Sequence, residues 1–170
     1  VQIALRLGTM NRDLVYVGGA VTGLLVTDPA APEIRITTDV DCIVEVATRA
    51  DYDTRIRDQL TERGFVEMRG DGIPICAWTA DGLRVDVMPT NDALGFSNPW
   101  YRGALSTATP FELGEISIRV ISPAYFLATK LEAFESRGGG DFLASHDLED
   151  IVAVIDGRAE IATDVRQSDP

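Results

Sequence analysis

The chain has 170 residues with a hydrophobic fraction of 45%, which suffices for one domain with an ordinary core. Its formal net charge of -12 argues against a broad basic surface for nucleic acid. The two cysteines, Cys42 and Cys76, form no CxxC motif, and we expect no signal segment and no membrane span, so a cytoplasmic location is predicted.

The first predicted elements lead to a pair of glycines. Residues 1–7 (VQIALRL) predict a short helix, residues 14–17 (LVYV) a strand, and residues 20–26 (AVTGLLV) another short helix. Gly18 and Gly19 lie between this strand and the second helix, where the backbone can approach a ligand closely and the amide groups of a helix start attract anions. A plain turn is the alternative.

The next predicted strand carries two acids. Ile36–Val46 (ITTDVDCIVEV) is rich in strand-forming residues, yet Asp39 and Asp41 lie in its middle. Because side chains alternate along a strand, both acids point to one face, and Val40 and Cys42 point to the other. Two such carboxylates repel each other unless a cation lies between them, and Mg²⁺ prefers oxygen ligands completed by substrate phosphates. The alternative is a strand end at which both acids are simply hydrated.

A helix and three strands follow this segment. Residues 48–64 predict an amphipathic helix with Thr48 as its cap and Gly64 as its stop. The three strands are predicted over residues 65–69 (FVEMR), 74–80 (PICAWTA) and 83–89 (LRVDVMP), with a hairpin turn at Asp81-Gly82 between the last two.

Asp86 repeats the oddity of an acid inside an apolar strand, LRVDVMP. If its strand lies beside that of Asp39 and Asp41, the three carboxylates form a cluster. Without a metal ion, the three carboxylates would repel one another. With Mg²⁺, two of them can hold ions that bridge substrate phosphates, while the third contacts the reacting hydroxyl.

The second half of the chain is predicted to be mostly helical. Residues 90–109 predict a loop with one short helix, and residues 114–122 predict a further strand. Ser122-Pro123 is a typical helix start, so one helix is predicted from there to the glycines at 138–140, and another over residues 145–157. The order predicts an α/β (α+β) fold: a mixed-sheet core over residues 1–121 and a helical segment over residues 122–170.

Lys130, in the first of these helices, is the single lysine beside fourteen arginines. A lysine offers phosphate a compact point charge where an arginine offers a planar fork. This choice of residue indicates a phosphate contact, and a surface lysine retained by chance is the alternative.

The segments VYVGGA, TTDVDCIVEV and LRVDVMP, in this order, resemble the nucleotidyltransferase superfamily of DNA polymerase β. The resemblance implies transfer of a nucleoside monophosphate from an NTP to a hydroxyl, with Mg²⁺ as the cofactor. Gly18 and Gly19 would then contact the triphosphate. Asp39, Asp41 and Asp86 would bind metal, with Asp86 as the third carboxylate and base.

The segment ATKLEAFESRGGGDFLASHDLEDI resembles the toxin nucleotidyltransferases of abortive-infection (AbiEii-type) systems, which carry a helical lysine and then an R-D-x-x-D helix. The matching residues are Lys130, Asp147 and Asp150, with His146 in place of the usual arginine. The resemblance implies that Lys130 and Asp147 bind the nucleotide and that an antitoxin protein is a partner. For His146 a capping or surface role is expected.

The chain departs from the family pattern between Gly19 and Asp39. This segment is longer than usual, with TDPAAPEIR inserted.

Two alternative functions stay open. The chain could also be a nucleotide-binding pseudoenzyme that binds a partner, or an antibiotic-modifying transferase whose acidic charge suits an amine-rich drug. The acceptor could be a tRNA 3′ end, a protein hydroxyl or a small molecule, and the preferred NTP is not specified.

Overall fold

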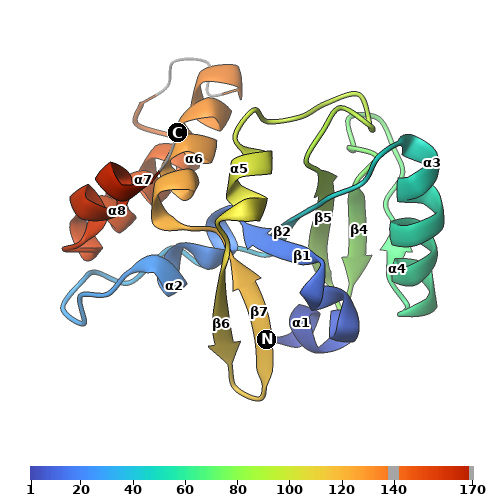
Figure 1. Cartoon of the computed structure of the whole chain (residues 1–170), viewed down its shortest axis with the longest axis horizontal. Coiled ribbons are helices and arrows are strands. Elements are labelled where there is room, and N and C mark those ends of the chain that lie inside the picture. The colour runs from blue at the N-terminus through green and yellow to red at the C-terminus, as the bar shows by residue number, and fades with distance from the viewer. Residues whose placement is uncertain (138–141, 169–170) are drawn as a thin grey trace.

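The structure, a computed structural model, describes residues 1–137 and 142–168. Within those residues, seven strands form one mixed sheet in the order β3-β4-β5-β2-β1-β7-β6. The strands are β1 (Leu14–Val17), β2 (Asp39–Val44), β3 (Val66–Glu67), β4 (Ala77–Ala80), β5 (Leu83–Pro89), β6 (Thr109–Leu113) and β7 (Ile116–Val120). This arrangement confirms the predicted α/β class (Figure 1).

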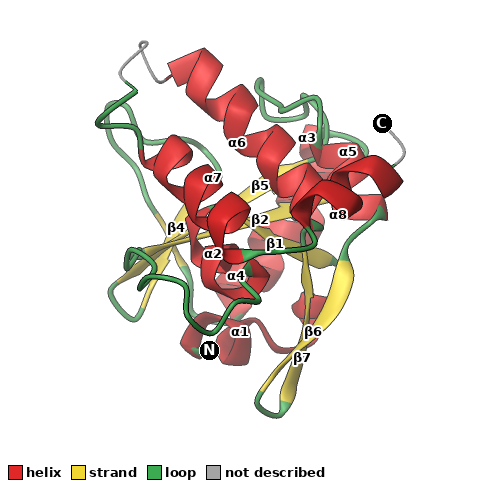
Figure 2. Cartoon of the chain, turned by 90° about the vertical axis from the view of Figure 1, so that its left-hand side faces the viewer, coloured by secondary structure: helices red, strands yellow, loops and turns green. Residues whose placement is uncertain are grey.

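Helices cover the sheet on both sides. They are α1 (Gln2–Leu7), α2 (Thr22–Leu25), α3 (Arg49–Asp51), α4 (Asp58–Glu62), α5 (Tyr101–Ser106), α6 (Pro123–Arg137), α7 (His146–Gly157) and α8 (Ile161–Gln167). In Figure 1, α3 and α4 lie at one end of the molecule and α6, α7 and α8 at the other. Figure 2 shows α6 and α7 in front of the sheet, so these helices lie on that side of the central strands. No helix in the described ranges is long and apolar enough to cross a membrane.

The helical run α3–α4 packs on the apolar face of the central strands. Thr48 accepts a hydrogen bond from the Asp51 amide at 3.2 Å, which confirms the predicted cap. A π-helical stretch joins α3 to α4, and Tyr52 within it is fully buried and donates its hydroxyl to the Val87 carbonyl at 2.8 Å. Since Val85 and Val87 are fully buried on this side of β5, the alternate residues of the strand point to the other face.

The C-terminal helices cover that other face. As predicted, α6 begins at Pro123, and its Phe126 is fully buried in the core. Ser145 caps α7 by accepting from the Leu148 amide at 3.3 Å. The hairpin of β6 and β7 projects from the body of the molecule (Figure 2).

The predicted elements differ from the structure in several places. β2 starts at Asp39 rather than Ile36, whose side chain is 91% exposed, so Asp39 begins the strand and Asp41 is its third residue. β6 was not predicted; it contains Pro110, which is tolerated because β6 is an edge strand. α8 was not predicted either. The predicted stop of α6 at the glycines lies outside the described residues.

Candidate functional site

The pairing of β2 with β5 brings two of the predicted acids together. These strands are parallel, and Asp41 lies directly opposite Asp86. Paired positions on neighbouring strands have side chains on the same face, and the strands themselves are only about 4.8 Å apart. The structure therefore places the Asp41 and Asp86 carboxylates side by side on the face that α6 covers.

Gly18 lies against Asp41 because β1 and β2 run antiparallel. Val17, the last residue of β1, pairs with Asp41, and Gly18 follows it with a φ of 67° and a ψ of -164°. A Cβ atom at Gly18 would overlap the Asp41 Oδ2 atom and would lie 2.9 Å from Asp41 Cγ. Both the backbone conformation and the close approach thus require glycine.

Gly19 faces the opposite side of the same turn. A Cβ atom there would lie 3.2 Å from Asp150 Oδ2 and 3.3 Å from an Arg35 guanidinium nitrogen. The element that follows is a 3-10 turn, Gly19–Val21, and then only four residues of α2. Because α2 is so short, its helix dipole contributes little to anion binding. Of the predicted anion site, only the backbone amides around the two glycines remain.

Arg84, which the sequence interpretation missed, holds Asp86. Its Nε lies 2.9 Å from Asp86 Oδ1, and a terminal nitrogen lies 2.7 Å from Asp86 Oδ2, so the pair is bidentate. The pKa of Arg84 is raised chiefly by this hydrogen bonding, with further contributions from the charges of Asp86, Asp39 and Asp41. The signal was present in the sequence, because residues two apart on a strand share a face.

Asp39 occupies the rim of this acidic region. It is the first residue of β2, is exposed, and pairs in register with Arg84. Across the described part of the chain, no three His, Cys, Asp or Glu side chains come together in a group ready to hold a metal ion. The donors that fit a hard cation are Asp41 and Asp86, which are oxygen ligands on one face with Gly18 leaving space beside them. The metal-binding roles of Asp39, Asp41 and Asp86 stay predictions.

Lys130 is buried rather than exposed. It is only 7% exposed, and its Nζ lies 2.9 Å from Asp147 Oδ1 and 2.6 Å from Asp150 Oδ2. Asp150 is 2% exposed and also contacts Arg35 at 3.5 Å. The structure thus joins the three residues matched to the toxin branch in one ion-paired group that ties α6 to α7, and Arg35 connects the inserted segment to it.

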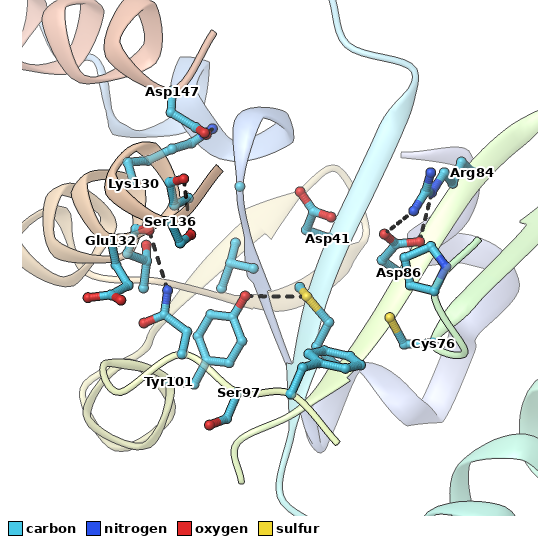
Figure 3. A pocket seen from close by; sticks show the side chains of 18 residues that line it. Asp41, Cys76, Arg84, Asp86, Ser97, Tyr101, Lys130, Glu132, Ser136 and Asp147 are labelled. Atoms are coloured by element: carbon cyan, nitrogen blue, oxygen red, sulfur yellow. Dashed lines mark hydrogen bonds and ion pairs between the residues drawn. The ribbon is translucent and has the colours of Figure 1, made fainter. Parts of the chain in front are cut away.

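Two adjoining cavities surround Asp41. One, of about 440 Å³, is bounded by Asp41, Arg84 and Asp86 on the strands and by Tyr101 and Lys130 on the helices. Figure 3 shows Asp41 between the Arg84–Asp86 pair and the Lys130–Asp147 pair. The second cavity, of about 490 Å³, shares Asp41, Lys130 and Asp147 with the first and extends past Gly19, Arg35 and Asp39.

The segment after β5 forms one wall of the first cavity. Asn98 donates its side-chain amide to the Thr129 carbonyl at 3.4 Å, and the Tyr101 hydroxyl lies 3.3 Å from the sulfur of Met88. These contacts join the segment to α6 and β5, and Phe96 also faces the cavity. Sequence reasoning could not place this wall, because residues 90–100 contain no regular element.

His146 and Glu132 lie at the edges of this site. His146 is exposed at the start of α7, with its Nδ1 3.2 Å from Glu149 Oε2, which confirms the surface role and leaves the cap to Ser145. Glu132 is half-buried at the cavity wall.

Both cysteine thiols near the acids are held protonated. Burial raises the pKa of Cys76 to about 12, with Asp86 adding to the effect. Burial also raises the pKa of Cys42 well above its usual value, and the charges of Asp41 and then Asp86 add to it. Neither thiol is therefore a nucleophile at neutral pH.

No protein-family model and no curated protein sequence matches the chain. Among solved structures, the chain is similar to an antigenic nucleotidyltransferase-like protein from Paracoccidioides brasiliensis, with a TM-score of 0.59 and 20% sequence identity. The match covers 97% of this chain and 84% of that one. At this level of identity the likeness shows the fold, so the chain has the nucleotidyltransferase-like fold that the sequence predicted.

Proposed function

We propose that the chain is a nucleotidyltransferase that moves a nucleoside monophosphate from an NTP to a hydroxyl acceptor. The observation that carries the proposal is the contact of Gly18 with Asp41, which itself lies opposite Asp86. Gly18 has a backbone conformation that other residues avoid, and it lies directly against the Asp41 carboxylate. With no side chain at this position, a phosphate group can approach both the backbone and the carboxylate. The nucleotidyltransferase-like fold supports the same activity.

The residues around Asp41 have distinct roles in this reaction. The backbone at Gly18 and Gly19 lies against the triphosphate, and Lys130 at the far wall offsets part of its charge. The acceptor oxygen bonds to the α-phosphorus as the bond to the pyrophosphate oxygen breaks. Asp86 takes the proton of the acceptor hydroxyl, and pyrophosphate leaves.

The acids also define where a cation would act. Asp41 and Asp86, with Asp39 at the rim, would hold Mg²⁺ together with phosphate oxygens. When bound there, Mg²⁺ neutralises negative charge on the phosphates.

For the biological role we propose the toxin of a toxin–antitoxin pair. The support is the ion-paired group of Lys130, Asp147 and Asp150, because these residues carry the resemblance to the AbiEii-type branch. On this proposal the acceptor is an RNA end or a protein hydroxyl, and an antitoxin protein is the partner.

The second candidate is a protein that binds a nucleotide but transfers nothing. The bidentate Arg84–Asp86 pair favours it, because a carboxylate engaged by a guanidinium is a poor base. Nucleotide binding with no labelled product would support this candidate.

The test is transfer of label from each α-³²P-NTP, with Mg²⁺, to three separate acceptors: total RNA, total protein, and an amine-rich aminoglycoside. Wild type should label one acceptor, and Asp41→Asn should label none. Asp71→Asn is the matched control, because Asp71 is exposed and lies outside both cavities, yet the charge change is the same. Equal labelling by the wild type and Asp41→Asn would exclude the proposed site. Labelling of the aminoglycoside alone would replace the toxin role with drug modification.

A further inference from the structure

Arg84 places a fixed positive charge at the point where the strand acids meet. Its guanidinium is bidentate to Asp86, at 2.9 and 2.7 Å, and its position on β5 pairs with Asp39 on β2. Asp41 is the next acid on the same face of β2. The guanidinium therefore binds Asp86 and also experiences the charges of Asp39 and Asp41, in the region where a divalent cation would bind.

We propose that Arg84 is an exchangeable counter-ion of this acidic site, which neutralises Asp86 when no divalent cation is bound and has to leave Asp86 before such a cation can bind. Arg84 thus acts on metal loading through Asp86 and sets the metal concentration that the site requires. This inference rests on the proposed function, because it takes the divalent cation from that proposal.

A purely structural role does not account for the pair. Arg84 and Asp86 are two residues apart on one strand, so their ion pair ties no second element to the sheet. The Arg84 side chain is 34% exposed at the cavity, and ion pairs with that much solvent contact add little to stability. In contrast, the fully buried core of the sheet is formed by the alternate residues of β5, Val85 and Val87. The contribution of Arg84 is therefore to the charge of the cavity.

The chain offers a closely matched pair away from the site. Arg69 also contacts an acid two residues before it, with its Nε at 3.1 Å and a terminal nitrogen at 2.7 Å from Glu67 Oε2. Arg69 is 81% exposed, and neither residue borders the two cavities at Asp41. Arg69→Gln hence changes the net charge of the protein as Arg84→Gln does, without changing the charge at the acids.

The expected effect follows from the charges. Removal of Arg84 makes the local charge more negative, from about -2, counted over Arg84, Asp39, Asp41 and Asp86, to about -3. Repulsion between a single and a double positive charge about 5 Å apart, even at the dielectric constant of water, corresponds to about a tenfold change in affinity. Metal affinity of Arg84→Gln should therefore rise by about tenfold or more.

The experiment is a titration of the whole chain with Mn²⁺ alone. Electron paramagnetic resonance measures the concentration of free Mn²⁺ at each step. Arg84→Gln should bind Mn²⁺ about tenfold more tightly than the wild type, and Arg84→Lys, which keeps a positive charge, should stay within about threefold of it. Arg69→Gln should match the wild type. Equal Mn²⁺ affinity of the wild type and Arg84→Gln, or an equal gain in Arg69→Gln, overturns the counter-ion role and leaves the proposed function standing.

A different result marks failure of the proposed function itself. If neither the wild type nor Arg84→Gln binds Mn²⁺, and addition of NTP restores no binding, the acids form no metal site and both proposals are wrong. Melting temperatures of the same variants check the fold. A structural ion pair would lower the melting temperature of Arg84→Gln without tightening Mn²⁺ binding, and that combination also overturns the counter-ion role.

Discussion

Gly18→Ala should damage both stability and nucleotide binding, because two separate penalties act at this residue. The first is the backbone. With φ at 67° and ψ at -164°, Gly18 occupies a region that is essentially restricted to glycine, and a residue with a Cβ atom there costs about 1–3 kcal/mol. The second is contact, since the new methyl group would overlap Asp41 Oδ2 and approach Asp41 Cβ to 3.0 Å.

The two penalties can be separated by a second glycine. Gly114, in the turn between β6 and β7, has a φ of 69°, and a Cβ atom there would meet nothing within 4 Å. Gly114→Ala therefore reports the cost of positive φ alone. Displacement of the Asp41 side chain from its preferred rotamer adds about 0.5–1.5 kcal/mol in Gly18→Ala. With about 2–4 °C per kcal/mol for a chain of this size, Gly18→Ala should melt about 3–18 °C below the wild type, and Gly114→Ala, which lacks the contact penalty, about 2–12 °C below.

Binding gives the sharper distinction. A ligand at about 100 times its Kd stabilises the folded state by about 2.7 kcal/mol, so NTP with Mg²⁺ should raise the wild-type melting temperature by about 5–10 °C. Differential scanning fluorimetry with NTP, Mg²⁺, both or neither should show this gain in Gly114→Ala and its loss in Gly18→Ala. If Gly18→Ala keeps the full gain, then neither Gly18 nor the Asp41 beside it contacts the bound nucleotide, and the reasoning fails.

Three further outcomes are expected. Asp39→Asn should weaken the metal-dependent thermal gain without abolishing it, because Asp39 is at the exposed rim; a complete loss in the same fluorimetric assay would move Asp39 to the centre of the site. Lys130→Met should cost about 3–5 kcal/mol in urea unfolding, because it leaves the buried Asp150 without its lysine, and the added change Asp150→Asn should recover part of that loss; equal stability of the single and double variants would contradict the ion-paired group. Stability should fall as pH rises above about 9, because the pKa values of Cys42 and Cys76 are raised in the folded state while the unfolded thiols ionise near their ordinary value; the slope of unfolding free energy between pH 8 and 10 should flatten in a variant with both cysteines changed to alanine.

The sequence predicts the sheet well where local pattern and burial agree. β5 has the predicted bounds, because LRVDV alternates between apolar and charged residues and the strand is delimited by a hairpin turn on one side. The proximity of Asp41 and Asp86 could be predicted for the same reason. An acid in an otherwise apolar strand points to the solvent-accessible face of the sheet, so acids on neighbouring strands lie on the same face. β6 was out of reach, since an edge strand needs neither burial nor an unbroken row of amide donors.

The charges of the site were harder to predict than its place. Alternation assigns Arg84 and Asp86 to the same face, but it does not say whether the guanidinium turns to the acid or to solvent. Similarly, Lys130 was expected at a phosphate, and its match to Asp147 and Asp150 in the toxin-like segment did not show that the three side chains form ion pairs between α6 and α7. Partners of this kind depend on tertiary packing and not on local spacing.

The described cations of the two cavities constrain how a nucleotide can bind. Arg84 pairs with Asp86, Lys130 with Asp147 and Asp150, and Arg35 with Asp150, so each enters the site with its charge already engaged by a carboxylate. A triphosphate that arrives alone would meet these acids and few uncommitted positive charges, which disfavours binding. A divalent cation changes this balance, because it attracts the strand acids and the phosphates at once. Metal and nucleotide should therefore bind together far better than either binds alone, and Arg84 is the residue whose departure from Asp86 makes room for them.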